Sequence, residues 1–447
     1  MSLFDKYVTT VERTEPQKFL GRVVRVQGLM IESQGPQAIV GELCQIELPT
    51  RDRWVWAEVV GLHGRTVQLM PFEEVDGLEI GCRVKAMGET LQVPVSDKLL
   101  GRVLDGLGRP VDGKGDIGSS VFYPAVSTPP DALNRQRITR KIATGVRSID
   151  ALVPLGKGQR LGIFAGSGVG KSTLLGMIAK NTSADVNVVA LIGERGREVR
   201  EFIDNELGPE GLARSVIVVS TSNTPALARL RGAYVATAVA EYFRDQGNDV
   251  MLLFDSVTRF AYAQREIGLA VGEPPARQGY TPSVFSLLPK LLERAGTGAV
   301  GTITGLYTIL VDGDDMDDPI ADSVRGILDG HVVLSRRLAD QGHYPAVDVL
   351  RSVSRLATKI TSPTAREAFA VLRRHMAVYA QAEDLINAGA YAPGSNPEID
   401  TAIKKYPEIR KFLVQTVEER APWLETLRRA AAIAGLSVGD AELEGAG

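Results

Sequence analysis

Apolar and polar residues follow three different patterns along this chain of 447 residues. Between residues 20 and 93, short segments alternate in part between apolar and polar positions and are bounded by glycines, as in the strands of a small barrel or sandwich. From about 160 to 335, continuous apolar runs alternate with segments of helical length, which predicts a parallel sheet covered by helices on both faces. After about residue 360, apolar residues recur at helical spacing.

These patterns predict three domains in a chain that is too long for one core. The segment 99–120 is dense in Gly and Asp, which is typical of a connector onto a new domain. The predicted limits are 1–95 for an N-terminal segment and small β-barrel domain, 96–358 for the α/β domain, and 359–447 for a C-terminal helical domain.

Composition narrows the class of protein. A formal net charge of -3 gives no bulk attraction to nucleic acid or to an anionic membrane. The two cysteines, Cys44 and Cys82, lack metal-ligand spacing and suggest a reducing compartment. The charged N-terminus contains no apolar signal-peptide core, and no apolar run reaches the roughly 20 residues of a membrane span. We therefore expect a cytoplasmic protein that works at a membrane only through partners.

The sequence AGSGVGKS, at 165–172, lies between a strand-like and a helix-like segment, the context of a phosphate-binding loop. Its glycines let backbone N–H groups surround phosphate oxygens at a helix N-terminus. Lys171 is expected to reach the β- and γ-phosphates of ATP, and Ser172 to ligate Mg²⁺. Ala165 replaces the first glycine of the strict pattern, and a simple Gly-rich turn is the alternative interpretation. The predicted nucleotide-binding residues of this loop are Gly166, Ser167, Gly168, Val169, Gly170, Lys171, Ser172 and Thr173.

A second acidic element follows downstream. The run DVMLLFD ends in Asp255 after a series of apolar residues, which is typical of the strand that places a carboxylate beside the Mg²⁺ of a P-loop domain. An acid that merely caps the strand end is the alternative. With the phosphate loop, this run predicts an α/β P-loop domain of the RecA-like class.

The stretch LIGERGREVREF, at 191–202, places six charges directly after a buried strand. Because ligands of open α/β sheets lie beyond the carboxyl ends of the strands, Glu194 is a candidate to activate the water that attacks the γ-phosphate. Arg195 is a candidate to brace that glutamate or the phosphate. The later charges are interpreted as the polar face of the next helix. The charge pattern alone also fits a solvated turn.

The motifs GERGREV and AGSGVGKS together resemble those of the catalytic subunits of rotary ATP synthases. The resemblance continues through TGVRSIDALVPLGKGQR at 144–160, LLERAG at 291–296 and GHYPAVDVLRSVSR at 342–355, and it covers essentially the whole chain. It implies that Glu194, which the family's non-catalytic subunits lack, activates the attacking water.

The same resemblance assigns roles to two residues near the end of the α/β domain. Arg355, in SVSR, matches the family's arginine finger, which enters a neighbouring subunit's site and stabilises charge on the transferring phosphoryl group. Tyr344 matches the aromatic residue that stacks on adenine. Since Glu194 and Arg355 occur in one chain, the resemblance implies a homohexameric ring. The alternatives are an Arg355 that starts a helix or pairs with an acid, and a Tyr344 buried in the core.

The segments 301–336 and 386–403 most resemble the flagellar members of the type III secretion ATPases. This implies ATP hydrolysis that drives or gates export of flagellar proteins, with a virulence (injectisome) secretion ATPase as the alternative. The five aspartates between 312 and 318 are interpreted as a solvent-facing loop at a subunit boundary, with a metal site as the alternative.

The resemblance also implies partners. Residues 1–18 are expected to dock a dimeric stator or regulator, and residues 272–296 to face the ring pore and a coiled-coil stalk protein. Gln278 departs from the arginine expected there. The remaining expected partners are a membrane export gate at the inner membrane and complexes of export chaperones with their substrates, and no nucleic acid is expected. A Rho-type nucleic-acid translocase and a non-catalytic ring subunit are the competing classes.

Overall fold

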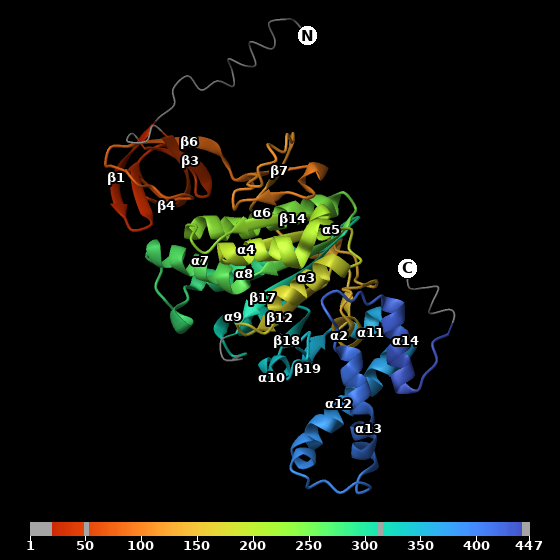
Figure 1. The fold of residues 1–447 in the computed structure, drawn as a ribbon. Helices are drawn as coiled ribbons and strands as arrows, with labels where there is room; N and C mark the ends of the chain where they lie inside the picture. Colours follow the sequence, from red (N-terminus) through yellow and green to blue (C-terminus); the bar gives the residue numbers. More distant parts are fainter. Residues whose placement is uncertain (1–19, 49–52, 312–315, 440–447) are drawn as a thin grey trace, which may run out of the picture.

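The computed structural model describes residues 20–48, 53–311 and 316–439, which form three parts in series. In Figure 1 the barrel strands lie at one end, the α/β domain lies in the middle, and helices α12, α13 and α14 lie at the other end.

The N-terminal part is a closed antiparallel barrel with the strand order β1-β2-β5-β4-β3-β6. Each strand contributes an inward apolar residue, and together these residues fill the interior, as expected of a barrel this small. The strands are β1 (Gly21–Gln27), β2 (Met30–Gln34), β3 (Glu42–Leu48), β4 (Arg53–His63), β5 (Thr66–Pro71) and β6 (Arg83–Thr90). From β1 to β6 in turn, these inward residues include Val23, Ile31, Ile46, Val55, Leu69 and Val84.

The central part contains a sheet of nine strands. Along the order β19-β18-β12-β17-β15-β13-β14-β8 all neighbours are parallel except β19, which runs antiparallel to β18, and β16 pairs antiparallel with β17. The strands are β8 (Val103–Leu104), β12 (Arg160–Ala165), β13 (Val186–Ile192), β14 (Ser215–Ser220), β15 (Asp249–Asp255), β16 (Gly296–Thr297), β17 (Thr302–Leu310), β18 (Gly330–Leu334) and β19 (Val347–Ser354).

The continuous apolar runs arise because successive residues of each strand enter two different cores. On β15, Leu252 and Phe254 pack in the core that contains helices α6, α7 and α8, whereas Met251 and Leu253 pack in the core that contains α2 and α3. The helices and turns of this part are η2 (Asp97–Leu99), η3 (Ala132–Asn134), α2 (Arg147–Leu152), α3 (Lys171–Asn181), α4 (Gly196–Glu201), η4 (Phe202–Leu207), α5 (Gly208–Ala213), α6 (Ala226–Asp245), α7 (Val257–Ala270), η5 (Arg277–Gly279), α8 (Pro282–Leu292), α9 (Pro319–Ile327) and α10 (Arg336–Asp340).

Two small antiparallel pairs join the parts: β7 (Gln92–Val95) with β9 (Val121–Pro124), and β10 (Lys141–Ile142) with β11 (Leu155–Gly156). The segment 99–120, which the sequence predicts as a connector, also supplies the edge strand β8. This strand is only two residues long, so no alternation in the sequence could reveal it.

The C-terminal part is helical: α11 (Ala357–Ile360), α12 (Pro363–Asn387), α13 (Pro397–Leu413) and α14 (Trp423–Ala434). Two of these helices start with the same local chemistry. The side chains of Ser362 and Asn396 accept hydrogen bonds from the first-turn N–H groups of α12 and α13, and proline follows each of them.

Polar contacts fix the outer parts to the central domain. Arg231 of α6 and Glu58 of β4 form a buried bidentate ion pair between the central domain and the barrel. Arg147 of α2 donates to the carbonyl of Phe412 at 2.7 Å and pairs with Glu419 in the C-terminal part. Because breaking such buried pairs is costly, we expect the three parts of a protomer to move largely together.

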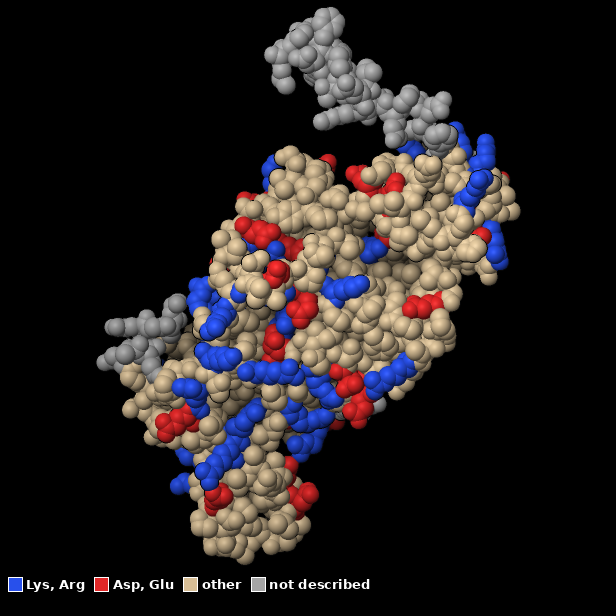
Figure 2. Space-filling view, turned by 180° about the vertical axis from the view of Figure 1, so that it is seen from behind, with Lys and Arg blue, Asp and Glu red and all other residues tan. Residues whose placement is uncertain are grey.

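The predicted fold class is confirmed, whereas the limits 1–95, 96–358 and 359–447 stay predictions. Among the described residues, no helix is both long and apolar enough to cross a membrane. On the face seen in Figure 2, Lys and Arg side chains gather in a band near the C-terminal end of the molecule. Toward the middle of the same face, Asp and Glu side chains lie among the basic ones.

Candidate active site

The predicted phosphate loop connects β12 to α3. Gly168 and Gly170 adopt positive φ angles of 78° and 92°, which glycine accepts without strain and other residues do not. The α3 helix begins at Lys171, so its N-terminal dipole end lies at the loop. Ala165 is fully buried in the hydrophobic core, so its methyl group does not occupy the loop surface and its departure from the strict pattern is compatible with phosphate binding.

Three charged side chains meet at the carboxyl ends of the strands. Lys171 Nζ lies 2.5 Å from Asp255 Oδ1 and 3.5 Å from Glu194 Oε1. Burial disfavours the ammonium, but the two carboxylates outweigh that effect, so the pKa of Lys171 is raised. The three elements therefore form one compact charged site, as the sequence motifs predict.

The sheet order explains this meeting. β12, β15 and β13 lead to Lys171, Asp255 and Glu194, and they run parallel with β17 between β12 and β15. Thr308 of β17 donates its hydroxyl hydrogen to Asp255 Oδ1 at 2.8 Å and so helps to orient the carboxylate. The sequence offers no motif for Thr308, because its role depends on which strand lies between the other two.

The electrostatic environment of Glu194 suits a proton acceptor. Burial, followed by the negative charge of Asp255, raises its pKa to about 7. Within the described part of the chain, its Oε1 atom is buried and forms no hydrogen bond. The same oxygen lies 3.5 Å from the Lys171 ammonium. A carboxylate with a pKa near neutral can accept a proton from a water molecule at physiological pH.

Glu198, which the sequence interpretation places on the polar face of a helix, also contacts the site. It shares a hydrogen bond with Glu194, and this bond lowers the pKa of Glu198 and helps to raise that of Glu194. Arg195 lies 3.5 Å from Glu198 and is largely exposed. The structure thus connects Arg195 to Glu194 through Glu198. These contacts are possible because Glu198 lies in the first turn of α4.

Gly193 explains how the chain turns into this site. Its φ is +72°, and a Cβ atom at this position would lie only 2.7 Å from the Cβ of Arg259. Any larger residue would displace the strand end that carries Glu194. Arg259, which the sequence does not identify, packs on this turn, and its Nε atom is buried without a hydrogen-bond partner among the described residues.

The remaining loop residues fit a nucleotide with Mg²⁺. Ser167, Gly168 and Ser172 are exposed, and no described residue would lie within 4 Å of a Cβ at Gly168, so the loop surface is open to phosphate oxygens. Ser172 is exposed in the first turn of α3, directly after Lys171, and its hydroxyl together with the Asp255 carboxylate supplies the kind of oxygen ligands that Mg²⁺ prefers. Thr173, by contrast, donates to Glu206 at 3.2 Å.

Two contacts reach the phosphate loop from the end of the domain. The ring of Tyr344 lies 3.7 Å from the position of a Cβ on Gly170, and the side chain is 47% exposed. It is therefore not a buried core residue. Arg336 donates to the Ser167 carbonyl at 2.9 Å. Tyr344 thus offers an exposed aromatic face next to the loop.

Arg355 lies away from the site of its own chain. It follows β19, whose Ser354 pairs with Gly330, and Gly330 is level with Leu161 on β12. Ala165 is four residue steps beyond Leu161, or about 13 Å along the strand, and β19 is the second strand away from β12. Arg355 is exposed, and its Nη2 lies 3.4 Å from the carbonyl of Arg325 at the end of α9.

Two sequence predictions fall partly or wholly outside the described residues. The docking segment 1–18 lies outside them, as do positions 312–315 of the aspartate-rich stretch. Asp318 is described, and its carboxylate caps α9 by accepting from the N–H groups of Ile320 and Ala321. Gln278, which departs from the expected arginine, has a positive φ of 47°, a left-handed conformation that is uncommon for a residue other than glycine.

Comparison with known families identifies each of the three parts of the chain. Residues 145–354 match the nucleotide-binding domain of the ATP synthase alpha/beta family, and residues 23–88 match the beta-barrel domain of that family. Residues 361–431 match the C-terminal domain of the type III secretion ATPase EscN.

Individual relatives cover nearly the whole chain. The flagellum-specific ATP synthase of Treponema pallidum is 56% identical over 98% of both chains, and that of Bacillus subtilis is 53% identical over 96% of this chain and 98% of the relative. The type 3 secretion system ATPase of Xanthomonas euvesicatoria is 50% identical over 94% of this chain and 96% of its own.

A solved structure agrees with the fold. The assembled ATPase EscN of the type III secretion system of enteropathogenic E. coli superposes with a TM-score of 0.88 at 44% identity, over 93% of this chain and 100% of EscN. The family and the hydrolytic activity expected from the sequence are confirmed. The chain belongs to the ATP synthase alpha/beta family, as an ATPase of its flagellar and type III secretion branch.

Proposed function

We propose that this protein forms a homohexameric ring that hydrolyses ATP at the interfaces between protomers and so drives or gates the export of flagellar proteins. One observation carries the proposal. Lys171, Glu194 and Asp255 assemble within one protomer, whereas the exposed Arg355 lies at the opposite end of the same sheet. A second copy is needed to bring both groups to one phosphate.

The chemical step follows from the charges of the site. Lys171 attracts the β- and γ-phosphates, which compete with its two carboxylate partners. Glu194 orients the attacking water and accepts its proton at the buried oxygen. When bound, Mg²⁺ would neutralise phosphate charge. Ser172 would hold it directly and Asp255 through water.

The neighbouring protomer supplies Arg355, whose guanidinium stabilises negative charge on the transferring phosphoryl group. Tyr344 supports the adenine ring by stacking, because its exposed face adjoins the phosphate loop. Arg195 braces Glu194 indirectly, through the carboxylate of Glu198.

Partners are proposed by analogy with relatives. A solved structure of EscN contains its central stalk EscO, with a TM-score of 0.86 to this chain at 44% identity. We therefore propose a stalk protein in the pore of the ring next to residues 272–296. A dimeric stator at residues 1–18, the export gate, and chaperone–substrate complexes complete the proposed assembly, which works in the cytoplasm at the inner membrane.

The test measures export in cells and turnover in the purified protein. Cells that carry Glu194→Gln in place of the natural chain are expected to secrete much less flagellar protein, and the purified variant to lose ATP turnover. Full secretion by a variant without turnover would contradict a role of hydrolysis in export.

Two other outcomes would redirect the function. A selective loss of virulence effectors would favour the injectisome alternative, which the 50% identity to a Xanthomonas secretion ATPase keeps open. Strong stimulation of turnover by cytosine-rich single-stranded RNA would favour a nucleic-acid translocase.

A further inference from the structure

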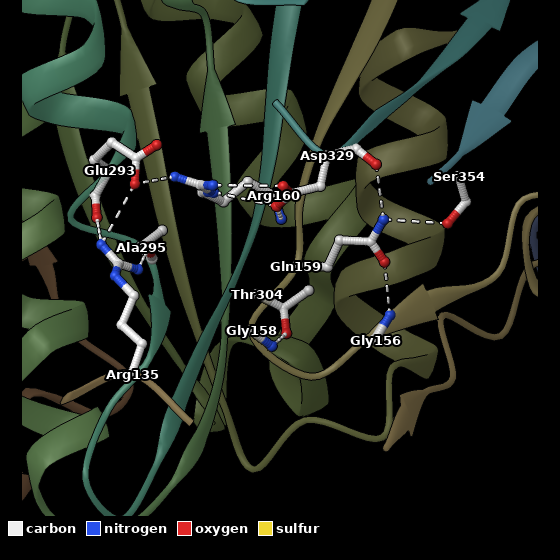
Figure 3. Close-up of polar contacts among 10 residues, drawn as sticks. All are labelled: Arg135, Gly156, Gly158, Gln159, Arg160, Glu293, Ala295, Thr304, Asp329 and Ser354. Atoms are coloured by element: carbon white, nitrogen blue, oxygen red, sulfur yellow. Dashed lines mark hydrogen bonds and ion pairs between the residues drawn. The ribbon is translucent and has the colours of Figure 1, made fainter. Parts of the chain in front are cut away.

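A network of one buried and four partly buried polar residues lies at the amino end of β12, at the opposite end of the strand from the phosphate loop (Figure 3). We call it the β12 network and define it as Gln159, Arg160, Glu293, Asp329 and Ser354. Its members come from four separate segments of the chain, which meet only in the folded domain. The hydrolytic mechanism above uses none of them.

Gln159 is the hub of the network. Its side chain is fully buried and uses its amide on both sides, since Oε1 accepts from the N–H of Gly156 at 2.9 Å. Its Nε2 donates to the carbonyl of Asp329 at 3.2 Å and to Ser354 Oγ at 3.1 Å. The same Asp329 carbonyl accepts the backbone N–H of Arg355 at 3.0 Å. One buried amide therefore fixes both Ser354 and the backbone of Arg355.

Two ion pairs extend the network to helix α8. The Asp329 carboxylate accepts from the backbone N–H of Arg160 at 3.1 Å and from its Nε at 3.2 Å. The Nη1 of Arg160 lies 2.5 Å from Glu293 Oε2, directly after the last residue of α8. Arg135 then holds the end of α8, because its guanidinium donates to the carbonyls of Glu293 and Ala295.

The network fixes the backbone of Arg355, whereas the side chain of Arg355 is exposed. Gly330 lets β18 approach β19 closely, because a Cβ at this position would lie only 2.3 Å from the Val353 carbonyl. Among the described residues, the guanidinium of Arg355 forms one long hydrogen bond, at 3.4 Å, to the carbonyl of Arg325. Supporting residues that fix the backbone of a catalytic residue help to preorganise it. The exposed guanidinium of Arg355 stays accessible to another subunit.

We propose that the β12 network is a positioning unit for Arg355, which sets where the finger points and links it to the end of α8. Gln159, Arg160, Glu293 and Asp329 are thus positioning residues and do not touch the substrate. The inference rests on the proposed function, in which Arg355 acts in the site of a neighbouring protomer. It further implies that a movement of α8 changes the position of the finger.

The test uses rings of two inactive variants in equal amounts. Lys171→Ala protomers lack a working phosphate loop but offer a normal finger, and Arg355→Ala protomers have the reverse defect. Every active interface in such a ring combines the finger of the first variant with the phosphate loop of the second. Glu293→Gln is then added either to the finger donor or to the phosphate-loop donor.

We expect Glu293→Gln in the finger donor to lower kcat by about tenfold, because misplacing a catalytic group by about 1 Å costs up to ~10²-fold. The KM for ATP should not change, since the phosphate loop belongs to the other protomer. The same substitution in the phosphate-loop donor should have little effect. Equal effects from both placements, or none from either, would overturn the inference.

The design separates the two proposals. If the ring of Lys171→Ala and Arg355→Ala protomers shows no turnover although both variants co-assemble, the shared site itself is wrong. If this ring is active but insensitive to Glu293→Gln, only the positioning role is wrong.

A second variant covers the case in which Glu293→Gln does not fold, and a matched control detects general destabilisation. Ser354→Ala removes one acceptor of Gln159 with a small change in volume, and it should reproduce the effect in the finger donor if Glu293→Gln does not fold. Glu266→Gln breaks the pair of Glu266 with Arg229, which has a similar distance of 2.6 Å and a similarly exposed carboxylate but lies outside the network. It should leave kcat unchanged in either position, and a tenfold loss with it would attribute the effect to general destabilisation.

Discussion

In the proposed mechanism the two ends of the central sheet supply different groups to one reaction, and the two ends differ in burial and contacts. At the carboxyl end, Lys171, Glu194 and Asp255 are mostly buried and contact one another within the protomer. At the opposite end, the guanidinium of Arg355 is exposed and weakly held, although its backbone is fixed. In the proposed mechanism, one half of the site therefore forms when the protomer folds, and the other half forms only when protomers assemble.

The substitution that should lower turnover most removes Arg355, the exposed half of the proposed site. Arg355→Ala should lower turnover by about 10³–10⁵-fold, because it removes the cation that stabilises charge on the transferring phosphoryl group. ATP binding should persist, since the phosphate loop is intact. Arg351→Ala, at an exposed position of the same strand, is the matched control and should keep most activity. Steady-state hydrolysis by the assembled ring measures both, and similar losses in both would argue against a specific finger.

The next largest loss of turnover should come from a substitution of Glu194, in the buried half of the proposed site. Glu194→Gln keeps the shape of the side chain but removes the proton acceptor, so turnover should fall by about 10²–10⁴-fold. Binding of a fluorescent ATP analogue should remain. Glu201→Gln, on the exposed face of α4, is the control and should behave as the natural chain. Substantial turnover by Glu194→Gln would mean that another group activates the water.

The pH dependence of kcat/KM tests the role of Glu194 as a base. A base acts only when it is deprotonated, so kcat/KM should rise with pH through about 7, the raised pKa of Glu194, and then level off. Glu198→Gln removes a negative neighbour that favours the protonated form, so the rising limb should move to lower pH. A limb that stays in place would exclude Glu198 as a cause of the raised pKa. Glu418→Gln, outside the site, is the control.

The smallest expected change is in the KM for ATP and comes from Tyr344, the residue proposed to stack on adenine. Tyr344→Ala should raise the KM for ATP about fivefold, because an exposed stacking contact contributes about 1 kcal/mol. Tyr344→Phe keeps the ring and should restore the natural KM. A change in kcat with an unchanged KM would mean that Tyr344 positions the loop and does not bind the base.

The sequence predicts the buried half better than the exposed half, for physical reasons. β13 and β15 are buried on both faces and appear as continuous apolar runs, and the motifs at their ends locate Glu194 and Asp255. β19 is an edge strand with polar positions, so hydrophobic pattern alone does not reveal it. Arg355 is found only through family resemblance.

Other parts of the site depend on tertiary contacts that no local pattern contains. Thr308 reaches Asp255 because β17 lies between β12 and β15, and Gln159, next to β12, reaches Ser354 of β19 past the intervening strand β18. The charge pattern predicts Glu198 as part of a polar helix face, yet one turn of helix returns its carboxylate to Glu194. Such contacts follow from strand order and helix direction, which sequence spacing alone does not fix.

The most direct test of the shared site is the structure of the assembled ring with a non-hydrolysable ATP analogue and Mg²⁺. We expect the Arg355 guanidinium of one protomer to leave the carbonyl of Arg325 and to lie about 3 Å from the γ-phosphate held by Lys171 of the next, with Glu194 facing the same phosphate. A ring in which Arg355 remains on Arg325 at every nucleotide-filled interface would contradict it.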